Sequence, residues 1–125
     1  MDNKKRGNAG EDLACRFLER NGYKILERNK HYSRFCEIDI IAQYKKTVVF
    51  VEVKTRKSKS YGYACEYVTE SKMKKIILTA EAYLGNVEYP PVRFDVVEIY
   101  YFEADNCLRL KSINHIENAF SAEGC

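Results

Sequence analysis

Apolar residues recur along the chain with two different periods, which predict helices and strands in alternation. Between residues 8 and 21 the apolar positions follow helical spacing, and Gly22 comes next as a typical stop. A second stretch, 70–84, carries its apolar residues on one side, with Thr69 as a plausible N-cap and Gly85 at its end. The pattern therefore predicts two amphipathic helices.

Segments rich in Val, Ile, Tyr and Phe predict β-strands between turn-like residues. These strands are expected at residues 23–29, 36–43, 47–54, 92–102 and 107–113. A loop is expected at 56–69, and the tail after His115 is expected to fray or to dock as a short helix. The resulting order, α-β-β-β-α-β-β, predicts an α/β fold with a mixed sheet flanked by helices and a right-handed crossover. The first helix can cover the same face of the sheet as the second helix or the opposite face.

The length of 125 residues predicts a single domain over 1–125, with its core at about 7–113 and a tail at 114–125. Hydrophobic residues make up 46% and charged residues 31%, as is typical of a globular protein. The longest apolar stretch, 47–53, is too short to span a membrane, and the polar N-terminus predicts a cytoplasmic location. The five cysteines lie too far apart for a C-x-x-C pair, which argues against structural zinc.

The net charge of +3 is too small to indicate a binding partner, but the distribution of charge along the chain is more informative. Between residues 54 and 75 there are many more basic than acidic side chains, a pattern that suits contact with a phosphate backbone. The predicted phosphate-contacting residues are Arg56, Lys57, Lys59, Lys72, Lys74 and Lys75. Charge alone favours the simpler alternative of a solvated surface.

Acidic and basic residues interrupt two apolar strands near one place. Glu52 and Lys54 share a face at the end of the segment 47–54, and Asp39 interrupts the preceding strand. If the intervening turn is the two-residue Lys45-Lys46, Asp39 falls opposite Glu52, with Cβ atoms roughly 4.5–5.5 Å apart. A three-residue turn would place the two carboxylates on opposite faces unless a bulge restored the phase.

Two carboxylates so close together repel each other unless a proton or a cation neutralises them. Mg²⁺ or Mn²⁺ suits two carboxylates with waters and a phosphate oxygen, and Lys54 could orient a water or stabilise developing negative charge. Glu11 could add a further carboxylate. The alternatives are a salt bridge or solvated pair among Asp39, Glu52 and Lys54, and a Glu11 that only favours a helix N-terminus.

The combined pattern resembles the D…E-x-K core of the PD-(D/E)XK nuclease superfamily, and more narrowly the bacterial YraN family, which is related in fold to archaeal Holliday junction resolvases. The matching segments are Gly10-Glu11-Asp12-Leu13-Ala14, Gly22-Tyr23, Arg28-Asn29, Glu37-Ile38-Asp39-Ile40-Ile41-Ala42, Phe50-Val51-Glu52-Val53-Lys54-Thr55-Arg56, Lys72, Ala82-Tyr83-Leu84 and Arg93-Phe94-Asp95-Val96-Val97. Cys36 replaces the family's usual Gly, and Ile38 replaces the superfamily's proline. Neither departure removes a ligand.

The resemblance implies a restriction-endonuclease-like α-β-β-β-α-β core with Glu11, Asp39, Glu52 and Lys54 at catalytic positions. Metal ligation is then expected at Asp39, Glu52 and Glu11, and the expected activity is a Mg²⁺-dependent (or Mn²⁺-dependent) endonuclease acting on DNA, branched or damaged DNA included. Resolvase-like nucleases often act as symmetric dimers, so a homodimer is an option. The alternatives are a non-catalytic DNA-binding module with the same fold, and an interaction subunit indifferent to DNA and metal. Asp95 is expected to be structural, and His31 and His115 to be surface residues.

Overall fold

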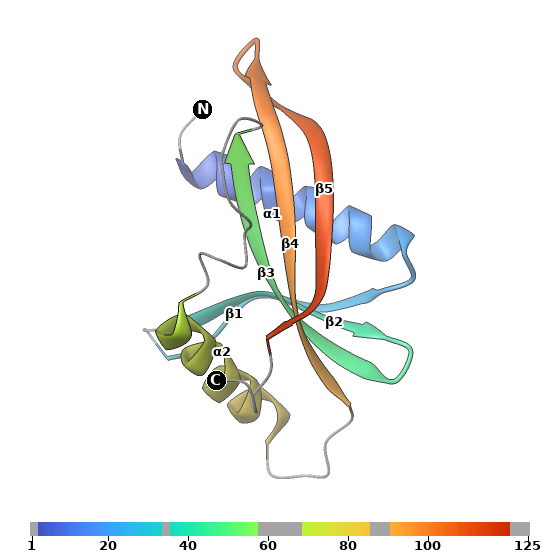
Figure 1. Cartoon of the computed structure of the whole chain (residues 1–125), viewed down its shortest axis with the longest axis vertical. Coiled ribbons are helices and arrows are strands. Elements are labelled where there is room, and N and C mark those ends of the chain that lie inside the picture. Colours follow the sequence, from blue (N-terminus) through green and yellow to red (C-terminus); the bar gives the residue numbers. More distant parts are fainter. Residues whose placement is uncertain (1–2, 34–35, 58–68, 86–90, 121–125) are drawn as a thin grey trace.

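The chain forms a five-stranded sheet with one helix against each face (Figure 1). The computed structural model describes residues 3–33, 36–57, 69–85 and 91–120. Its elements are α1 (Asn3–Arg20), β1 (Lys24–Ser33), β2 (Cys36–Tyr44), β3 (Thr47–Lys57), α2 (Glu70–Leu84), β4 (Val92–Ala104) and β5 (Cys107–Phe120). The predicted order of elements and the α/β class are confirmed.

The strands lie in sequence order across the sheet, β1-β2-β3-β4-β5. All neighbours pair antiparallel except β3 and β4, which run parallel from Val48↔Val92 to Lys57↔Tyr101. The helix α2 lies between these two strands in the chain and provides the crossover that a parallel pair needs. Figure 1 shows the strong twist of the sheet, in which β1 and β2 run across the direction of the other three strands.

Two apolar clusters fill the spaces between the sheet and the helices. The α2-side cluster joins Ile76 and Ala80 of the helix to Phe50 of β3 and other sheet residues. The α1-side cluster joins Leu18 and its helical neighbours to Val51 and the opposite set of sheet residues. The two helices therefore cover opposite faces, which decides between the two arrangements that the sequence allows.

The helix α1 lies directly against β3 at Gly10. A Cβ atom placed on Gly10 would lie 2.2 Å from the Thr55 Oγ1, so any larger residue would collide with the strand. The absent side chain thus lets the helix lie against β3 beside Lys54 and next to its own Glu11.

Several predicted boundaries are wrong. The strand β1 ends at Ser33 instead of residue 29, and β3 ends at Lys57 instead of residue 54. The helix α1 begins at Asn3 instead of residue 8, and β5 continues to Phe120 through the segment expected to fray or to form a helix. The strand continues because β4 pairs with it along its whole length, up to Phe94↔Phe120, and because Phe120 packs against the α2-side cluster. Of the predicted loop at 56–69, the first two residues extend β3, and 58–68 lie outside the described residues.

Within the described residues, neither helix combines the length and the apolar character that a membrane span requires.

Candidate functional site

The hairpin between β2 and β3 sets the register of the candidate site. Its turn has two residues, because Tyr44 pairs with Thr47, and Lys45 adopts a φ of +54° there. The ladder continues to Ile40↔Val51, so the next residues along the two strands are Asp39 and Glu52. Of the two turns that the sequence allowed, the structure has the two-residue one, which brings Asp39 and Glu52 to adjacent positions just past the last pair of the ladder.

Both acidic side chains belong to the side of the sheet that α2 covers. Phe50 lies in the α2-side cluster, and alternation along β3 places Glu52, two residues further, on that side. Alternation is interrupted in β2, because Ile38 and Ile41 both lie in the α2-side cluster. Asp39 is assigned to the same side because its charge raises the pKa of Glu52 and because Lys72 of α2 acts on both acids. The backbone N–H of Val53 donates a hydrogen bond to Asp39 Oδ2 at 2.8 Å.

The two carboxyl groups are largely withdrawn from water. Glu52 is only 5% exposed, and its Oε1 atom is buried without a hydrogen-bond partner among the described residues. Burial raises the pKa of Asp39 to about 6, against the opposing effect of the Val53 N–H. Burial, followed by the charge of Asp39, raises the pKa of Glu52 to about 7. The pair therefore resists carrying two negative charges at once.

Two lysines partly offset this repulsion. Lys54 lies two residues beyond Glu52 on the same face of β3, is half-buried, and lowers the pKa of Glu52. Lys72 lies in the first turn of α2, where the Thr69 side chain accepts a hydrogen bond from its backbone N–H. The charge of Lys72 lowers the pKa of both acids, so the helix brings a cation to the pair.

Glu11 comes from α1, on the other side of the sheet. The Arg28 side chain lies 3.6 Å from Glu11 Oε2 and 2.9 Å from Asp12 Oδ1, and the buried Oε2 of Glu11 has no hydrogen-bond partner among the described residues. The charge of Glu11 raises the pKa of Asp39, so the two groups are electrostatically coupled. The alternative role at a helix N-terminus is wrong, because α1 begins at Asn3 and has no acidic residue in its first turn.

Across the part of the chain that the structure describes, no three His, Cys, Asp or Glu side chains are grouped closely enough to hold a metal ion. The structure thus places Asp39 near Glu52, and the charge of Glu11 acts on Asp39 while its side chain lies within ion-pair distance of Arg28. The role of Glu11 as a third ligand stays a prediction.

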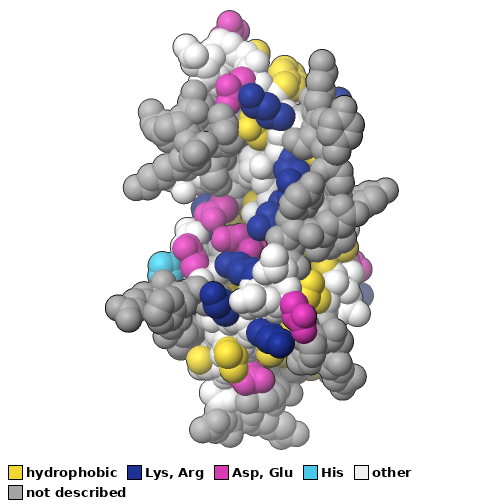
Figure 2. Space-filling model, turned by 60° about the vertical axis from the view of Figure 1, so that its left-hand side comes forward, with side chains coloured by type: hydrophobic (Ala, Val, Ile, Leu, Met, Phe, Trp, Pro, Cys, Tyr) yellow, Lys and Arg dark blue, Asp and Glu magenta, His cyan; other side chains and the backbone are white. Residues whose placement is uncertain are grey.

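The predicted phosphate-contacting residues fall into two groups. Arg56 and Lys57 end β3, with Arg56 half-buried and Lys57 exposed, while Lys59 lies outside the described residues. On α2, Lys74 and Lys75 are exposed, and Lys74 lies 3.6 Å from Glu70. Figure 2 shows a face on which acidic side chains gather beside a row of Lys and Arg side chains.

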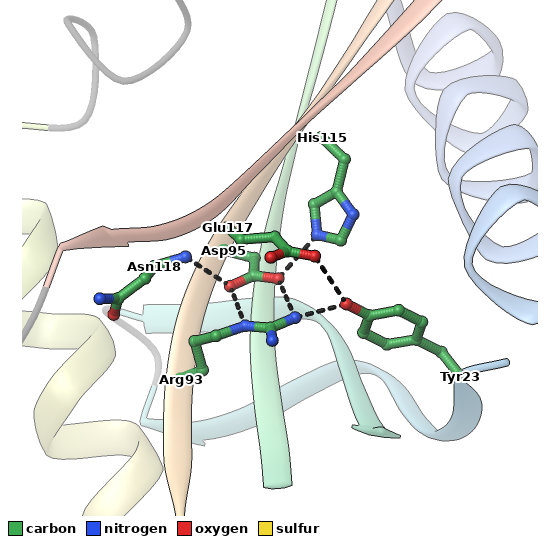
Figure 3. A network of polar contacts seen from close by, with 6 residues as sticks. All are labelled: Tyr23, Arg93, Asp95, His115, Glu117 and Asn118. Atoms are coloured by element: carbon green, nitrogen blue, oxygen red, sulfur yellow. Dashed lines mark hydrogen bonds and ion pairs between the residues drawn. The ribbon is translucent and has the colours of Figure 1, made fainter. Parts of the chain in front are cut away.

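A buried polar network on the α1 side of the sheet was not predicted (Figure 3). Arg93 donates two hydrogen bonds to Asp95, each 2.8 Å long, and a third to the hydroxyl of Tyr23. Asp95 is fully buried and also contacts His115 Nε2 at 2.7 Å and the backbone N–H of Asn118 at 2.9 Å. The network joins Tyr23, the residue before β1, to β4 and β5.

This network fixes the protonation of Asp95. Burial alone would raise its pKa, but the hydrogen bonds from His115, Arg93 and the Asn118 N–H hold the pKa below its ordinary value. The prediction that His115 lies on the surface is wrong: its side chain is 11% exposed, because β5 continues past residue 113 and carries it against Asp95. His31 is exposed, as predicted, and lies 3.2 Å from Glu37.

Glu98 is a second buried carboxylate that sequence reasoning missed. It is fully buried on β4, where Tyr100 and Asn114 donate hydrogen bonds to its two oxygens at 2.5 and 2.7 Å. The available signal was its interruption of the apolar stretch of β4, much as Glu52 interrupts β3.

The donor set at Asp39 and Glu52 fits a divalent cation. Both donors are hard carboxylate oxygens, which Mg²⁺ and Mn²⁺ prefer. The buried Oε1 of Glu52 has no hydrogen-bond partner among the described residues, and burial raises the pKa of both acids even though the charge of Lys72 acts on both, so the lysines do not supply the full compensating charge. A cation between these groups would supply that charge.

Comparison with known proteins gives one consistent result. The model of the "uncharacterised protein family UPF0102" matches residues 10–99, which include all four predicted catalytic positions. A UPF0102 protein of Clostridioides difficile is 45% identical over 122 residues, covering 96% of this chain and 100% of that protein. Another, from Caldanaerobacter subterraneus, is 44% identical and covers 96% and 98% of the two chains. One from Cytophaga hutchinsonii is 47% identical over 100 residues, 79% of this chain and 88% of its own.

Proposed function

Since the chain belongs to the UPF0102 family, we propose that this member is a metal-dependent endonuclease that hydrolyses phosphodiester bonds in DNA. The observation that carries the proposal is the closeness of Asp39 and Glu52 just past the end of the β2–β3 ladder, where the charge of Asp39 raises the pKa of Glu52. Two buried carboxyl groups that lie close together suit a hard divalent ion, which neutralises their charges.

Asp39 and Glu52 would hold the ion, and the hydrogen bond from Val53 would fix one oxygen of Asp39 in its orientation. When bound, Mg²⁺ or Mn²⁺ supplies a Lewis acid that polarises the phosphodiester and makes its attached water more acidic. Lys54, on the same face as Glu52, would orient the attacking water and stabilise negative charge on the phosphate.

Lys72 occupies a different position from the other predicted phosphate contacts. Its charge acts on both Asp39 and Glu52, so in the free protein it is a counter-charge of the acid pair. A DNA phosphate that binds beside the divalent ion at Asp39 and Glu52 would also attract Lys72. Lys74 and Lys75, exposed on α2, together with Lys57, would hold the backbone and read no sequence.

The resemblance to the YraN family and to PD-(D/E)XK nucleases supports DNA as the substrate. The YraN family is similar in fold to archaeal Holliday junction resolvases, which favours branched DNA as the substrate. Two symmetric cuts in such a junction would require a homodimer. A cytoplasmic location belongs to the same proposal, because DNA of a bacterial cell lies there.

The decisive experiment incubates purified protein with supercoiled plasmid, linear duplex and a four-way junction, each with Mg²⁺ or Mn²⁺. Glu52→Gln keeps the shape of the side chain, and cleavage should fall by about 100-fold, because a metal contact worth several kcal/mol is lost. Asp105→Asn, in the exposed turn between β4 and β5, is the matched control and should cleave as the wild type does. If no substrate is cut, or if Glu52→Gln cuts as well as the wild type, the proposal fails.

A second candidate function is a nucleic-acid-binding module that keeps the nuclease fold without catalysis. The observation that favours it is the ion pair of Glu11 with Arg28, which leaves two instead of three acids together among the described residues. Isothermal titration calorimetry with Mn²⁺ distinguishes the two functions. An enzyme should bind Mn²⁺, and Asp39→Asn should abolish this binding. A binding module should bind DNA but should not bind Mn²⁺ through Asp39.

A further inference from the structure

The half of the sheet beside the β4–β5 turn extends beyond the cover that α2 provides (Figure 1). The α2-side cluster takes Phe94 and Val96 from the start of β4, and among the described residues it takes none from further along that strand. Side chains on this side of the outer half of β4 therefore lie beyond the helix, on the same side of the sheet as Glu52.

Phe102 is an exposed aromatic residue on this face. Alternation along β4 gives Glu98 the side of Val96, and the hydrogen bond that the Tyr100 hydroxyl donates to Glu98 shows that Tyr100 shares it. Phe102 continues this alternation, because the extra residue of the nearby bulge belongs to β5. The residue is 48% exposed. A single exposed apolar side chain is common on protein surfaces, so its neighbours decide what it means.

Basic side chains lie on both strands next to β4. Arg109 of β5 is exposed and pairs directly with Phe102. Directly opposed residues share a face, with Cβ atoms roughly 4.5–5.5 Å apart. On β3, Lys54 and Arg56 share this face by alternation, and Arg56 lies opposite Tyr100 in an uninterrupted ladder. The face thus carries an exposed aromatic ring with basic residues on either side of its strand.

This combination suits an unpaired nucleotide. An aromatic ring stacks on the flat face of any base, and Arg or Lys side chains bind the phosphates beside it. Bases inside a duplex have both faces covered by their neighbours, so the ring can take only a base that has left the stack. The same face continues along β3 to Glu52, so one DNA strand can reach both places.

The strand register gives the spacing between the ring and the acid pair. Val96 lies level with Glu52, and Phe102 comes six residues later on β4, which corresponds to about 20 Å along the strand. A stacked DNA strand advances about 3.4 Å per nucleotide, so the ring lies about six nucleotides from a phosphodiester held at the acid pair.

We propose that Phe102 and Arg109 bind an unpaired segment of DNA, with a base stacked on the Phe102 ring, about six nucleotides from the bond that the acid pair cuts. This deepens the proposed function and rests on it, because it names DNA with an unpaired segment as the substrate class. The stacking itself can be tested without metal and without cleavage.

The test titrates the protein, in buffer with EDTA, into a short oligothymidylate that carries one 2-aminopurine base. Stacking on the ring should quench the fluorescence of this base. Phe102→Leu keeps an apolar side chain of similar size but removes the ring, and the oligonucleotide should then bind roughly ten-fold more weakly, with the quenching lost. Phe102→Tyr keeps the ring and should behave as the wild type. Equal binding and quenching by Phe102→Leu and the wild type overturn the proposal.

Leu110→Ala is the matched control. Leu110 is 43% exposed on the same hairpin, but it lines a small cavity with residues of α1 on the other side of the sheet. Its replacement should leave binding and quenching unchanged, and an equal loss in Leu110→Ala and Phe102→Leu would overturn the proposal. A blunt duplex offers no unpaired base, so Phe102→Leu should bind it as the wild type does. An equal loss for duplex and single strand would mean that the ring does not recognise unpaired bases.

The wild-type protein offers a measurement that does not depend on a variant. An oligonucleotide with 5-iodouracil, irradiated in complex with the protein, should crosslink to the peptide that contains Phe102, and crosslinks confined to other peptides would overturn the proposal. Light scattering tests the other occupant of this face, a second copy of the chain. A dimer that Phe102→Leu dissociates would mean that the ring joins two copies instead of binding DNA.

Failure of the nuclease and failure of the stacking site are distinguishable. If the wild type cuts a duplex with an unpaired flap, Phe102→Leu should raise KM and leave kcat unchanged. A wild type that cuts nothing would refute the nuclease, and the metal-free fluorescence would still decide whether Phe102 stacks on a base.

Discussion

The backbone N–H of Val53 donates to the side chain of Asp39 at the position where the pairing of β2 with β3 stops. The last regular pair is Ile40↔Val51, and beyond it the carboxylate serves as the partner of the β3 backbone. The acid is therefore held by the strand that carries Glu52. Its orientation depends on the backbone, and its charge acts directly on the neighbouring acid.

Replacement of Asp39 by Asn should lower the pKa of Glu52 below its value of about 7. The amide oxygen can still accept the Val53 hydrogen bond, so the change removes the charge and little else. Burial, the larger cause, remains, and the pKa should therefore stay above the ordinary value of 4.5. The measurement is a ¹³C NMR titration of the Glu52 carboxyl carbon. A pKa that does not move in Asp39→Asn would show that the two charges are independent.

The free energy of unfolding of the metal-free protein should fall as the pH rises from about 4.5 to 7 because of Glu52. A carboxyl group with a raised pKa binds its proton more tightly in the folded state, so its stabilising effect is complete below the unfolded pKa and is lost above the folded one. Glu52→Gln carries no such charge and should be more stable than the wild type by about 1–3 kcal/mol at pH 8. Urea unfolding across this pH range measures the difference.

Added Mg²⁺ provides the control for this prediction. A bound cation supplies the missing positive charge, so at pH 8 it should raise the unfolding free energy of the wild type and leave Glu52→Gln unchanged. Equal stabilisation of both proteins would show that Mg²⁺ binds elsewhere.

Loss of the Asp95 charge should destabilise the fold by about 3–5 kcal/mol, because a partly buried guanidinium would lose its counter-charge. Asp95→Asn leaves Arg93, only 19% exposed, facing an amide in place of a carboxylate. Since the pKa of Asp95 is held low, its contribution is present above the ordinary value of 3.8 and is lost as the pH falls below it. Denaturant unfolding at pH 7 measures the loss.

Glu117→Gln is the matched control for Asp95→Asn. Glu117 is exposed on the same strand as His115 and makes a long contact of 3.5 Å with the Tyr23 hydroxyl. Its replacement should change the stability by less than about 0.5 kcal/mol. A similar loss in both variants would contradict a central role for Asp95.

Gly10→Ala should destabilise the protein by about 1–3 kcal/mol, because the new methyl group would meet the Thr55 side chain. Removal of the Thr55 hydroxyl and methyl groups by Thr55→Ala takes away the closest of the contacting atoms. In the double variant, Gly10→Ala should therefore cost less than it does alone. Additive losses, measured by chemical unfolding of all four proteins, would show that the contact is not the cause.

Local alternation along the strands was enough to single out Asp39 and Glu52 and to state the condition under which they meet. A hairpin is determined by residues close together in sequence, so the sequence left only the length of its turn open, and the structure has the two-residue turn that the site requires. The site therefore lies in the most predictable part of the fold.

Positions that depend on distant strands were not predictable in this way. The ladder between β4 and β5 shifts register between Phe94 and Val96, opposite residues 116–120, so the part of β5 that was not predicted lacks a regular alternation. His115 and Asp95 meet only because that strand returns along β4. Glu98 lies beside Lys54 through the register of a parallel crossover, which no short segment of the sequence specifies.

The parallel pairing of β3 with β4 has a consequence for the order in which the chain folds. The β2–β3 hairpin forms from neighbouring segments, whereas β4 reaches β3 only after the whole of α2 intervenes, so hairpin closure should come first. The two acids then meet while water still surrounds them, and they lose that water only when α2 docks. Their repulsion should accordingly slow the docking step at alkaline pH, and stopped-flow refolding should show Glu52→Gln folding faster than the wild type at pH 8 and at the same rate at pH 4.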